Sequence, residues 1–237
     1  ATTLVDVIVN SSEIVDLPPR FEAHDYNFAI YENAEPQTIT VLHAFHPLAD
    51  DDHPIVYDIL DDSVNLNLKS EYFSVDSSTG ELRSLQALDY EQKQFYRFEV
   101  SACLQANKTS CGSCKVTVSV NDENDNSPQF QQPSYSVDLS IDTPVGTEVA
   151  RFIATDADSG NNADISYALK TPSAMFSLDY QSGSLVTVQK LSKSEELHLV
   201  VEAFDHGYPT RRDTADLFIN IHDDNPSAPE FDQVHLC

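Results

Sequence analysis

Oxygen-bearing side chains are concentrated near the middle of the chain, where residues 121–126 comprise three Asn, two Asp and one Glu. Calcium binds six to eight oxygen ligands in flexible geometry, and carboxylates, side-chain amides and backbone carbonyls all serve. A segment this short cannot surround an ion by itself, so further ligands must come from the chain on either side. The stretch therefore predicts a calcium site that its flanking domains complete.

The flanking segments are predicted to be β-strands arranged in repeats. The tripeptide Pro-x-Phe recurs with its phenylalanines at Phe21, Phe130 and Phe231, which are 109 and 101 residues apart. An alternating apolar run precedes each, and "GELRSL" and "GSLVTV" each place a Gly turn before a further strand. Alternation of period two is typical of half-buried strands, and we see no strong helical periodicity. Short, regularly spaced strands bounded by turn residues predict an all-β fold of tandem β-sandwiches.

The repeat period also predicts the domain boundaries. Two sandwich domains are expected at residues 18–126 and 127–226. Residues 1–17 are expected to be the last strand and linker of a preceding repeat, and residues 227–237 the start of a following one.

The charge balance excludes several classes of partner. Thirteen Lys and Arg against 39 Asp and Glu give a formal net charge of −26, which argues against nucleic acid and acidic membrane surfaces. A content of 41% hydrophobic residues suffices for ordinary cores. No apolar run is long enough to span a bilayer, and Ala1 does not open a signal peptide, so a mature protein or a piece of a larger one is expected.

Cysteines and glycosylation sequons favour an extracellular setting. The cysteines are Cys103, Cys111, Cys114 and Cys237, and sequons begin at Asn10 and Asn107. A hairpin disulfide from Cys103 to either Cys111 or Cys114 is expected, and the sequence leaves the choice open. The Cys111-x-x-Cys114 spacing also matches a redox motif, but it lacks the βαβ context, which favours a structural role.

Several motifs together resemble the extracellular repeat of the cadherin family. "DENDNSP" at the centre and "DADSGNNA" beyond it carry the resemblance, which covers the whole chain. The other family motifs have counterparts in "YENA" with Glu32, "LDYEQ" with Asp89 and Glu91, and "EAFDHG" with Asp205. The resemblance implies two tandem seven-stranded Greek-key sandwiches in an elongated arrangement, with three Ca²⁺ ions at the linker between them.

The same resemblance implies a role for each ligand. Glu32 and Glu91 are shared by the two outer ions, Asp89 binds the outermost, and Asp125 bridges those two. Asp158 bridges to the third ion. The ligands expected to complete that ion are the Asn124 side-chain oxygen, Asp156, Asp205 and the Asn162 carbonyl. Glu123 and Asn126 contribute backbone carbonyls, and Asp122 is expected to lie outside the direct ligands. Three ions nearly cancel the charge of the seven carboxylates.

The other two junctions depart from the family pattern on both sides at once. The first linker, "NSSEIVDLPPRF", has no Asp-x-Asn-Asp-Asn motif, and in the last linker Pro226 stands at the central Asp position. In the first repeat, His46-Pro47-Leu48 aligns with the Asp-x-Asp motif and Leu104 with the late Asp. In the second, Ile141 aligns with the upstream Glu, and Ser192-Lys193-Ser194 aligns with the acidic triplet. We therefore expect one stiff calcium junction between two calcium-free junctions.

Simpler explanations exist for individual motifs. Asp and Asn are common in turns because their side chains bond nearby backbone. His43, His46 and His53 could suggest zinc, but their irregular spacing in a loop favours surface or packing roles. Asp89 and Glu91 could be a glycosidase-like acid pair, but no nucleophile elbow or phosphate loop accompanies them. An enzyme is therefore not expected, and neither is a small-molecule substrate.

The resemblance implies a function in cell adhesion. We expect a calcium-dependent adhesive and structural segment in the extracellular part of a single-pass plasma-membrane glycoprotein. Its partner would be another cadherin on the same or an apposed cell, and it would meet the membrane only through a transmembrane segment of the parent protein. The chain has no Trp, so strand swapping is unsupported and a protocadherin-like or atypical cadherin is favoured. The alternative is a heterophilic receptor ectodomain that presents a ligand-binding face.

Overall fold

The computed structural model describes residues 17–50, 52–60 and 71–224. The chain divides into two compact units, Ala1–Glu123 (unit 1) and Asn124–Cys237 (unit 2). Residues 1–16 and 227–237, predicted to belong to neighbouring repeats, lie outside the described residues, as do the Asn10 sequon and Cys237.

Unit 1 is a β-sandwich. Its described strands are β1 (Arg20–Phe21), β2 (Asp25–Tyr31), β3 (Thr38–Val41), β4 (Ala44–Phe45), β5 (Ile55–Leu60), β6 (Phe73–Val75), β7 (Glu81–Ser84), β8 (Phe95–Leu104) and β9 (Asn107–Asn121). A four-stranded sheet in the order β2-β9-β8-β5 faces a three-stranded sheet in the order β3-β7-β6, and β1 pairs with β4. The chain passes between the two large sheets after β2, after β3 by way of β4, after β5 and after β7, which gives the crossing connections of a Greek-key sandwich.

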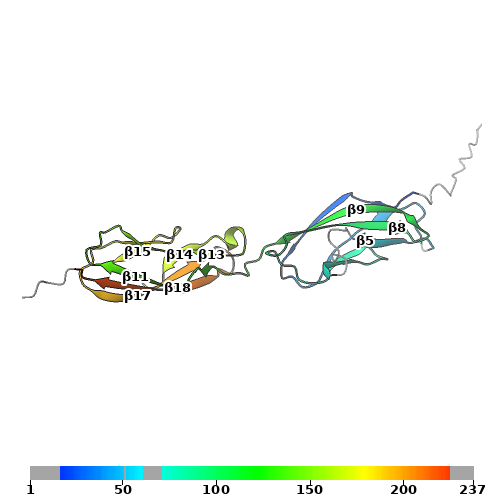
Figure 1. The fold of residues 1–237 in the computed structure, drawn as a ribbon. Coiled ribbons are helices and arrows are strands. Elements are labelled where there is room, and N and C mark those ends of the chain that lie inside the picture. Colours follow the sequence, from blue (N-terminus) through cyan, green and yellow to red (C-terminus); the bar gives the residue numbers. More distant parts are fainter. Residues whose placement is uncertain (1–16, 51, 61–70, 225–237) are drawn as a thin grey trace, which may run out of the picture. The chain divides into compact units, whose positions relative to one another are not determined.

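Unit 2 repeats this topology strand for strand. Its strands are β10 (Gln129–Phe130), β11 (Ser134–Ser140), β12 (Glu148–Arg151), β13 (Ala154–Thr155), β14 (Ser166–Leu169), β15 (Phe176–Leu178), β16 (Ser184–Thr187), β17 (Glu195–Phe204) and β18 (Arg212–His222). The sheets are β11-β18-β17-β14, β12-β16-β15 and β10-β13, and a 3₁₀ turn, η2 (Gly160–Asn162), follows β13. Figure 1 shows β8 and β9 side by side in unit 1 and β17 and β18 in unit 2. The all-β prediction is confirmed.

Each unit has a hydrophobic core of its own, supplied by the alternating strands that the sequence predicts. Along β8 and β9 of unit 1, Phe98, Val100, Val116 and Val118 point inward and are buried together with Phe73. Corresponding inward positions on β17 and β18 form the core of unit 2. Burial of large side chains like these contributes about 1.5–3 kcal/mol each, which holds the two sheets of each sandwich together.

Strand direction decides which loops meet at each end of a unit. Strands β2 and β9 are parallel, with Tyr31 opposite Asn121, so the residues that follow them lie at the same end, the C-terminal pole. Strand β8 runs antiparallel to β9 and therefore ends at the opposite, N-terminal pole, where Leu104 lies. Unit 2 has the same two poles because its β11 and β18 are parallel and its β17 and β18 are antiparallel.

One of the two disulfides left open by the sequence is formed. Cys103 and Cys111 face each other across β8 and β9 with their Cα atoms 4.4 Å apart, and they are bonded. This separation is typical of a non-hydrogen-bonded antiparallel pair, in which side chains approach most closely. Cys114 is a free, buried thiol in the core, and burial raises its pKa to about 11. It is therefore protonated and contributes to packing.

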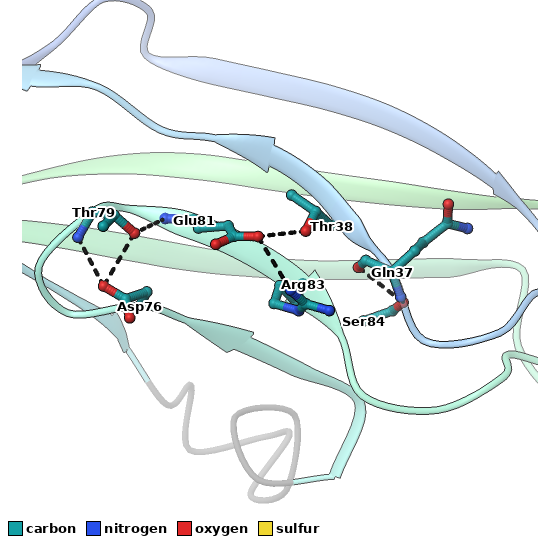
Figure 2. A network of polar contacts seen from close by, with 7 residues as sticks. All are labelled: Gln37, Thr38, Asp76, Thr79, Glu81, Arg83 and Ser84. Atoms are coloured by element: carbon teal, nitrogen blue, oxygen red, sulfur yellow. Dashed lines mark hydrogen bonds and ion pairs between the residues drawn. The ribbon is translucent and has the colours of Figure 1, made fainter.

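The β6–β7 turn of unit 1 is organised by one carboxylate. Asp76 Oδ1 accepts hydrogen bonds from the hydroxyls and backbone N–H groups of Ser78 and Thr79 at 2.6–3.0 Å. Figure 2 shows this turn beside Glu81, whose carboxylate contacts both Thr38 and Arg83. The bonds from Ser78 and then Thr79 lower the pKa of Asp76.

Replacing Asp76 by alanine is expected to lower the unfolding temperature of unit 1 at pH 7. A lowered folded-state pKa means that the carboxylate stabilises the fold above its unfolded pKa of about 3.9 and that this contribution fades as the pH falls below it. Calorimetry of wild type and variant in chelator should therefore show a difference that shrinks in acid. Asp179→Ala, in the matching turn of unit 2, should act on the other unit. A difference as large at pH 2 as at pH 7 would contradict the role of the charge.

No part of the described chain forms a helix with the length and apolar character needed to cross a membrane.

Candidate metal centre

The C-terminal pole of unit 1 gathers four of the predicted ligands. Glu32 follows β2 and is only 1% exposed, and its two oxygens accept the backbone N–H groups of Tyr90 and Glu123, each at 2.8 Å. Oxygens of Glu32, Asp89 and Glu91 all lie within 4.8 Å of one another. The parallel end of β2 and β9 thus brings Glu32 to Glu123, and the loop before β8 brings Asp89 and Glu91 to both.

These carboxylates form an electrostatically unfavourable cluster. Three negative charges at such separations repel one another, and burial of Glu32 strengthens the repulsion by removing water. The hydrogen bonds from Tyr90 and Glu123 stabilise Glu32, and Asp89 accepts a bond from the backbone N–H of Gln92 at 2.8 Å. A bound divalent cation would offset the remaining repulsion.

The N-terminal pole of unit 2 gathers a second group of predicted ligands. Asp205, at the end of β17, is 1% exposed and accepts the backbone N–H groups of Gly207 and Arg211, each at 2.9 Å. The Asn124 side-chain amide donates to Asp205 at 3.1 Å and to the Pro209 carbonyl at 2.7 Å. The first residue of unit 2 is thereby fixed against the loop between β17 and β18.

The "DADSGNNA" motif lies at the same pole. Asp158 is buried, and both the backbone N–H and the side-chain amide of Asn126 donate to it, the latter at 2.7 Å. Asp156 Oδ1 accepts the backbone N–H of Asp158 at 3.1 Å, and Asp125 accepts a 2.8 Å bond from the Asn126 side chain. Asn162 ends the 3₁₀ turn, which a hydrogen bond from His206 to the neighbouring Asn161 carbonyl ties to the loop after Asp205.

The side-chain oxygen of Asn124 indicates whether a cation would fit at this pole. Asn124 is 7% exposed, and its Oδ1 is buried without a hydrogen-bond donor among the described residues. A buried carbonyl oxygen that lacks a donor is costly unless something else satisfies it. Carboxylates and a carbonyl oxygen form an all-oxygen donor set that suits calcium, so the residues present fit the predicted ion.

The sequence prediction missed the groups that hold these ligands. Tyr90 contributes a backbone N–H to Glu32, while Gly207, Pro209 and Arg211 contact Asn124 or Asp205. The residues after Asp205, "HGYPTRR", carry the Gly and Pro typical of a tight loop and were the available signal.

The two units carry different residues at equivalent places of the N-terminal pole. Tyr57 and Tyr167 occupy the same position, since each hydroxyl accepts a backbone N–H at 3.0 Å from the strand before the ligand motif. Each of these tyrosines has a partner on the neighbouring strand. Two residues after that partner comes Leu104 in unit 1 and Asp205 in unit 2, so Leu104 takes the position of Asp205. Leu104 is 2% exposed, so an apolar side chain takes the place of a carboxylate.

A histidine takes the place of a second acid at this pole of unit 1. His46 follows β4 as Asp156 follows β13, and its Nδ1 accepts the backbone N–H of Leu48 at 3.1 Å. Asp156 makes the same turn contact with Asp158 at the same distance. The turn is preserved, while Leu48 replaces the Asp158 carboxylate.

The C-terminal pole of unit 2 lacks the Glu and the acidic triplet that unit 1 carries at the equivalent positions. Ile141 donates its backbone N–H to the His222 carbonyl, as Glu32 does to Asn121, so Ile141 occupies the place of the upstream Glu. Buried Leu88 and Leu191 precede "DYE" in unit 1 and "SKS" in unit 2, so Ser192 takes the position equivalent to Asp89. Among the residues that the structure describes, each unit therefore carries the acidic ligand set at one pole and not at the other.

Comparison with known proteins agrees with this architecture. The Cadherin domain matches residues 26–121 and 135–222. The chain is 34% identical over 96% of its length to Protein dachsous of Drosophila melanogaster, and 32% identical over 98% of its length to Protocadherin alpha-6 of Pan troglodytes. It spans 6% and 25% of the lengths of these two relatives. A solved structure of protocadherin gammaB7 EC3-6, described as a cis-dimer, has a TM-score of 0.81 at 27% identity and covers 87% of this chain and 52% of that one.

Proteins that carry this domain are extracellular glycoproteins of the plasma membrane that act in cell adhesion, and calcium binding is typical of them. The chain belongs to the cadherin family, as two consecutive cadherin repeats.

Proposed function

We propose that the chain is a calcium-dependent adhesive and structural segment of a cell-surface cadherin, with one three-calcium linker between its repeats and calcium-free junctions on either side. The observation that carries the proposal is the buried Asn124 Oδ1, which lacks a donor among the described residues and sits in an oxygen-rich pole. Asn124 directly follows Glu123, whose N–H is bonded to Glu32. Candidate ligands of unit 1 contact Glu123 and candidate ligands of unit 2 contact Asn124, two residues that are adjacent in the sequence.

The ligands would be divided between the two repeats. Glu32, Asp89, Glu91 and the Glu123 carbonyl would serve from unit 1, and the remaining predicted ligands would serve from unit 2. When bound, calcium supplies positive charge that neutralises carboxylates contributed by both repeats. The same neutralisation would stiffen the connection between the repeats, because the carboxylates repel one another without it.

The calcium-free junctions would rely on other contacts. The carboxylates of a calcium linker are missing at the N-terminal pole of unit 1, where Leu104 and His46 take their positions. They are likewise missing at the C-terminal pole of unit 2, where Ile141 takes the position of the upstream Glu. Any order at these junctions would come from direct domain contact, so they are places where a long ectodomain could bend.

The partner proposed is another cadherin, on the same or an apposed cell. The parent would be a single-pass plasma-membrane protein whose ectodomain includes these repeats. The alternative function is that of a heterophilic receptor ectodomain that presents a ligand-binding face.

Bead aggregation tests the proposed function. Beads coated with the longer ectodomain should cluster with one another in millimolar calcium and disperse in chelator. Beads of a second colour, coated with a different cadherin, separate the two modes: mixed clusters support the heterophilic alternative, and single-colour clusters support homophilic adhesion. Clustering that ignores calcium would contradict the proposed calcium dependence.

A further inference from the structure

We infer that Arg211 is a positioning residue for the third predicted calcium ion: it fastens the backbone of Asn124 to the Asp205 loop, so that the Asn124 side-chain oxygen is held in place before metal binds. This inference rests on the proposed function, because it concerns the same ligands. Arg211 itself is not expected to touch the ion.

Arg211 bridges the two ligands by two separate contacts. Its guanidinium Nε donates to the Asn124 backbone carbonyl at 2.5 Å, and its backbone N–H donates to Asp205 Oδ2 at 2.9 Å. Hydrogen bonds from a charged donor are about twice as strong as neutral ones. One residue thus links the start of unit 2 to the last ligand of the set, which is 81 residues further along the chain.

The other hydrogen bonds of Asn124 determine which of its polar atoms has no hydrogen-bond partner among the described residues. Its Nδ2 donates to Asp205 Oδ1 at 3.1 Å and to the Pro209 carbonyl at 2.7 Å, which uses both protons of the amide. The backbone carbonyl is bonded by Arg211. Oδ1 is therefore the buried acceptor that stays available for a cation.

The loop approaches Asn124 closely at Gly207. A Cβ added at Gly207 would lie 2.3 Å from Asn124 Nδ2 and 2.4 Å from Asn162 Oδ1, closer than real Cβ contacts allow. The Gly207 N–H also donates to Asp205 Oδ1 at 2.9 Å. Glycine is required here so that the loop can close on both asparagines.

Because Arg211 is charged, the direction of the change in calcium affinity tests the inference. A guanidinium near a cation site repels the cation, so removing the charge alone would tighten calcium binding. Removing the hydrogen bond to Asn124 would weaken calcium binding, because the free energy of binding would then have to cover the ordering of Asn124. Weaker calcium binding by an Arg211 variant therefore indicates a positioning role, and tighter binding indicates that the repulsive effect of the charge dominates.

Arg211→Met and Arg212→Met form a matched pair for calcium titration by calorimetry on the whole chain. Arg212 has the same charge, but its side chain pairs with Glu202 at 2.6 Å and lies over the Phe204 ring. We expect Arg211→Met to weaken binding at one ion about tenfold. Arg212→Met should stay within about twofold of wild type, as expected for an exposed pair. Equal or tighter binding by Arg211→Met would overturn the inference.

A metal-free readout separates this inference from the proposed function. In chelator, the Asn124 side-chain amide protons should exchange slowly in wild type and in Arg212→Met, and faster in Arg211→Met, as followed by NMR. Fast exchange in wild type would show that Asn124 is not held before metal binds and would overturn the inference. If wild type bound no calcium, the proposed function would fail, while amide exchange would still judge the Arg211 contact.

Discussion

Replacing Asp125 by alanine is expected to weaken calcium binding by the chain about 100-fold at the ions it serves. Changes to the groups that merely orient metal ligands typically cost 10–100-fold in affinity, so loss of a direct, bridging carboxylate should reach at least the upper end. Calcium affinity also falls when a carboxylate charge is removed from the site. Calorimetric titration of the whole chain would measure the loss.

The control for this variant is Asp138→Ala. Asp138 lies on β11, is exposed and accepts a bond from Asn220 at 2.8 Å, so its removal changes the net charge equally without touching a predicted ligand. Its calcium affinity should match that of wild type. Asp125→Ala that binds as tightly as Asp138→Ala would show the ligand assignment to be wrong.

Removal of calcium is expected to have the second large effect, on stability and on the connection between the repeats. With dissociation constants of about 0.1–1 mM, typical of extracellular modules, three ions at about 2 mM calcium stabilise the folded chain by about 2–5 kcal/mol. For domains of this size that corresponds to a fall in unfolding temperature of about 10 °C or more in chelator.

Calorimetry and small-angle scattering, each in calcium and in chelator, would check this expectation. Scattering should show a change in maximum dimension, because repelling carboxylates free the linker. The Asp125→Ala variant serves as the internal comparison, since it should respond less to calcium. Identical unfolding temperatures and dimensions in both buffers would count against calcium as the element that joins the repeats.

The sandwich fold could be predicted from the sequence because strand periodicity is a local property. The alternation in "KVTVSV" and "DLFINI" marks β9 and β18, and the Pro-x-Phe repeat marks the equivalence of the units. Glu32 and Asp205 could be chosen as ligands because their motifs have characteristic residue types. Strand pairing then determines where these two ligands lie. The parallel pairing of β2 with β9 places Glu32 at the C-terminal pole of unit 1, and the antiparallel pairing of β17 with β18 places Asp205 at the N-terminal pole of unit 2.

The supporting contacts could not be predicted, because they depend on how distant loops close. Nothing in the local sequence distinguishes Arg211, which reaches Asn124, from Arg212, which faces Glu202 on the sheet. The choice of Cys111 over Cys114 as the partner of Cys103 likewise depends on strand register, which places Cys114 in the core. His46 shows the converse: a turn contact can survive when its carboxylate is replaced.

The most direct test of the central claim is a count of calcium ions bound at the middle of the chain, from crystals grown in millimolar calcium. Three ions held by carboxylates of both repeats, with Asn124 Oδ1 on the ion nearest Asp205, are predicted. A junction without metal under those conditions, with Glu91 and Asp125 turned toward solvent, would contradict it.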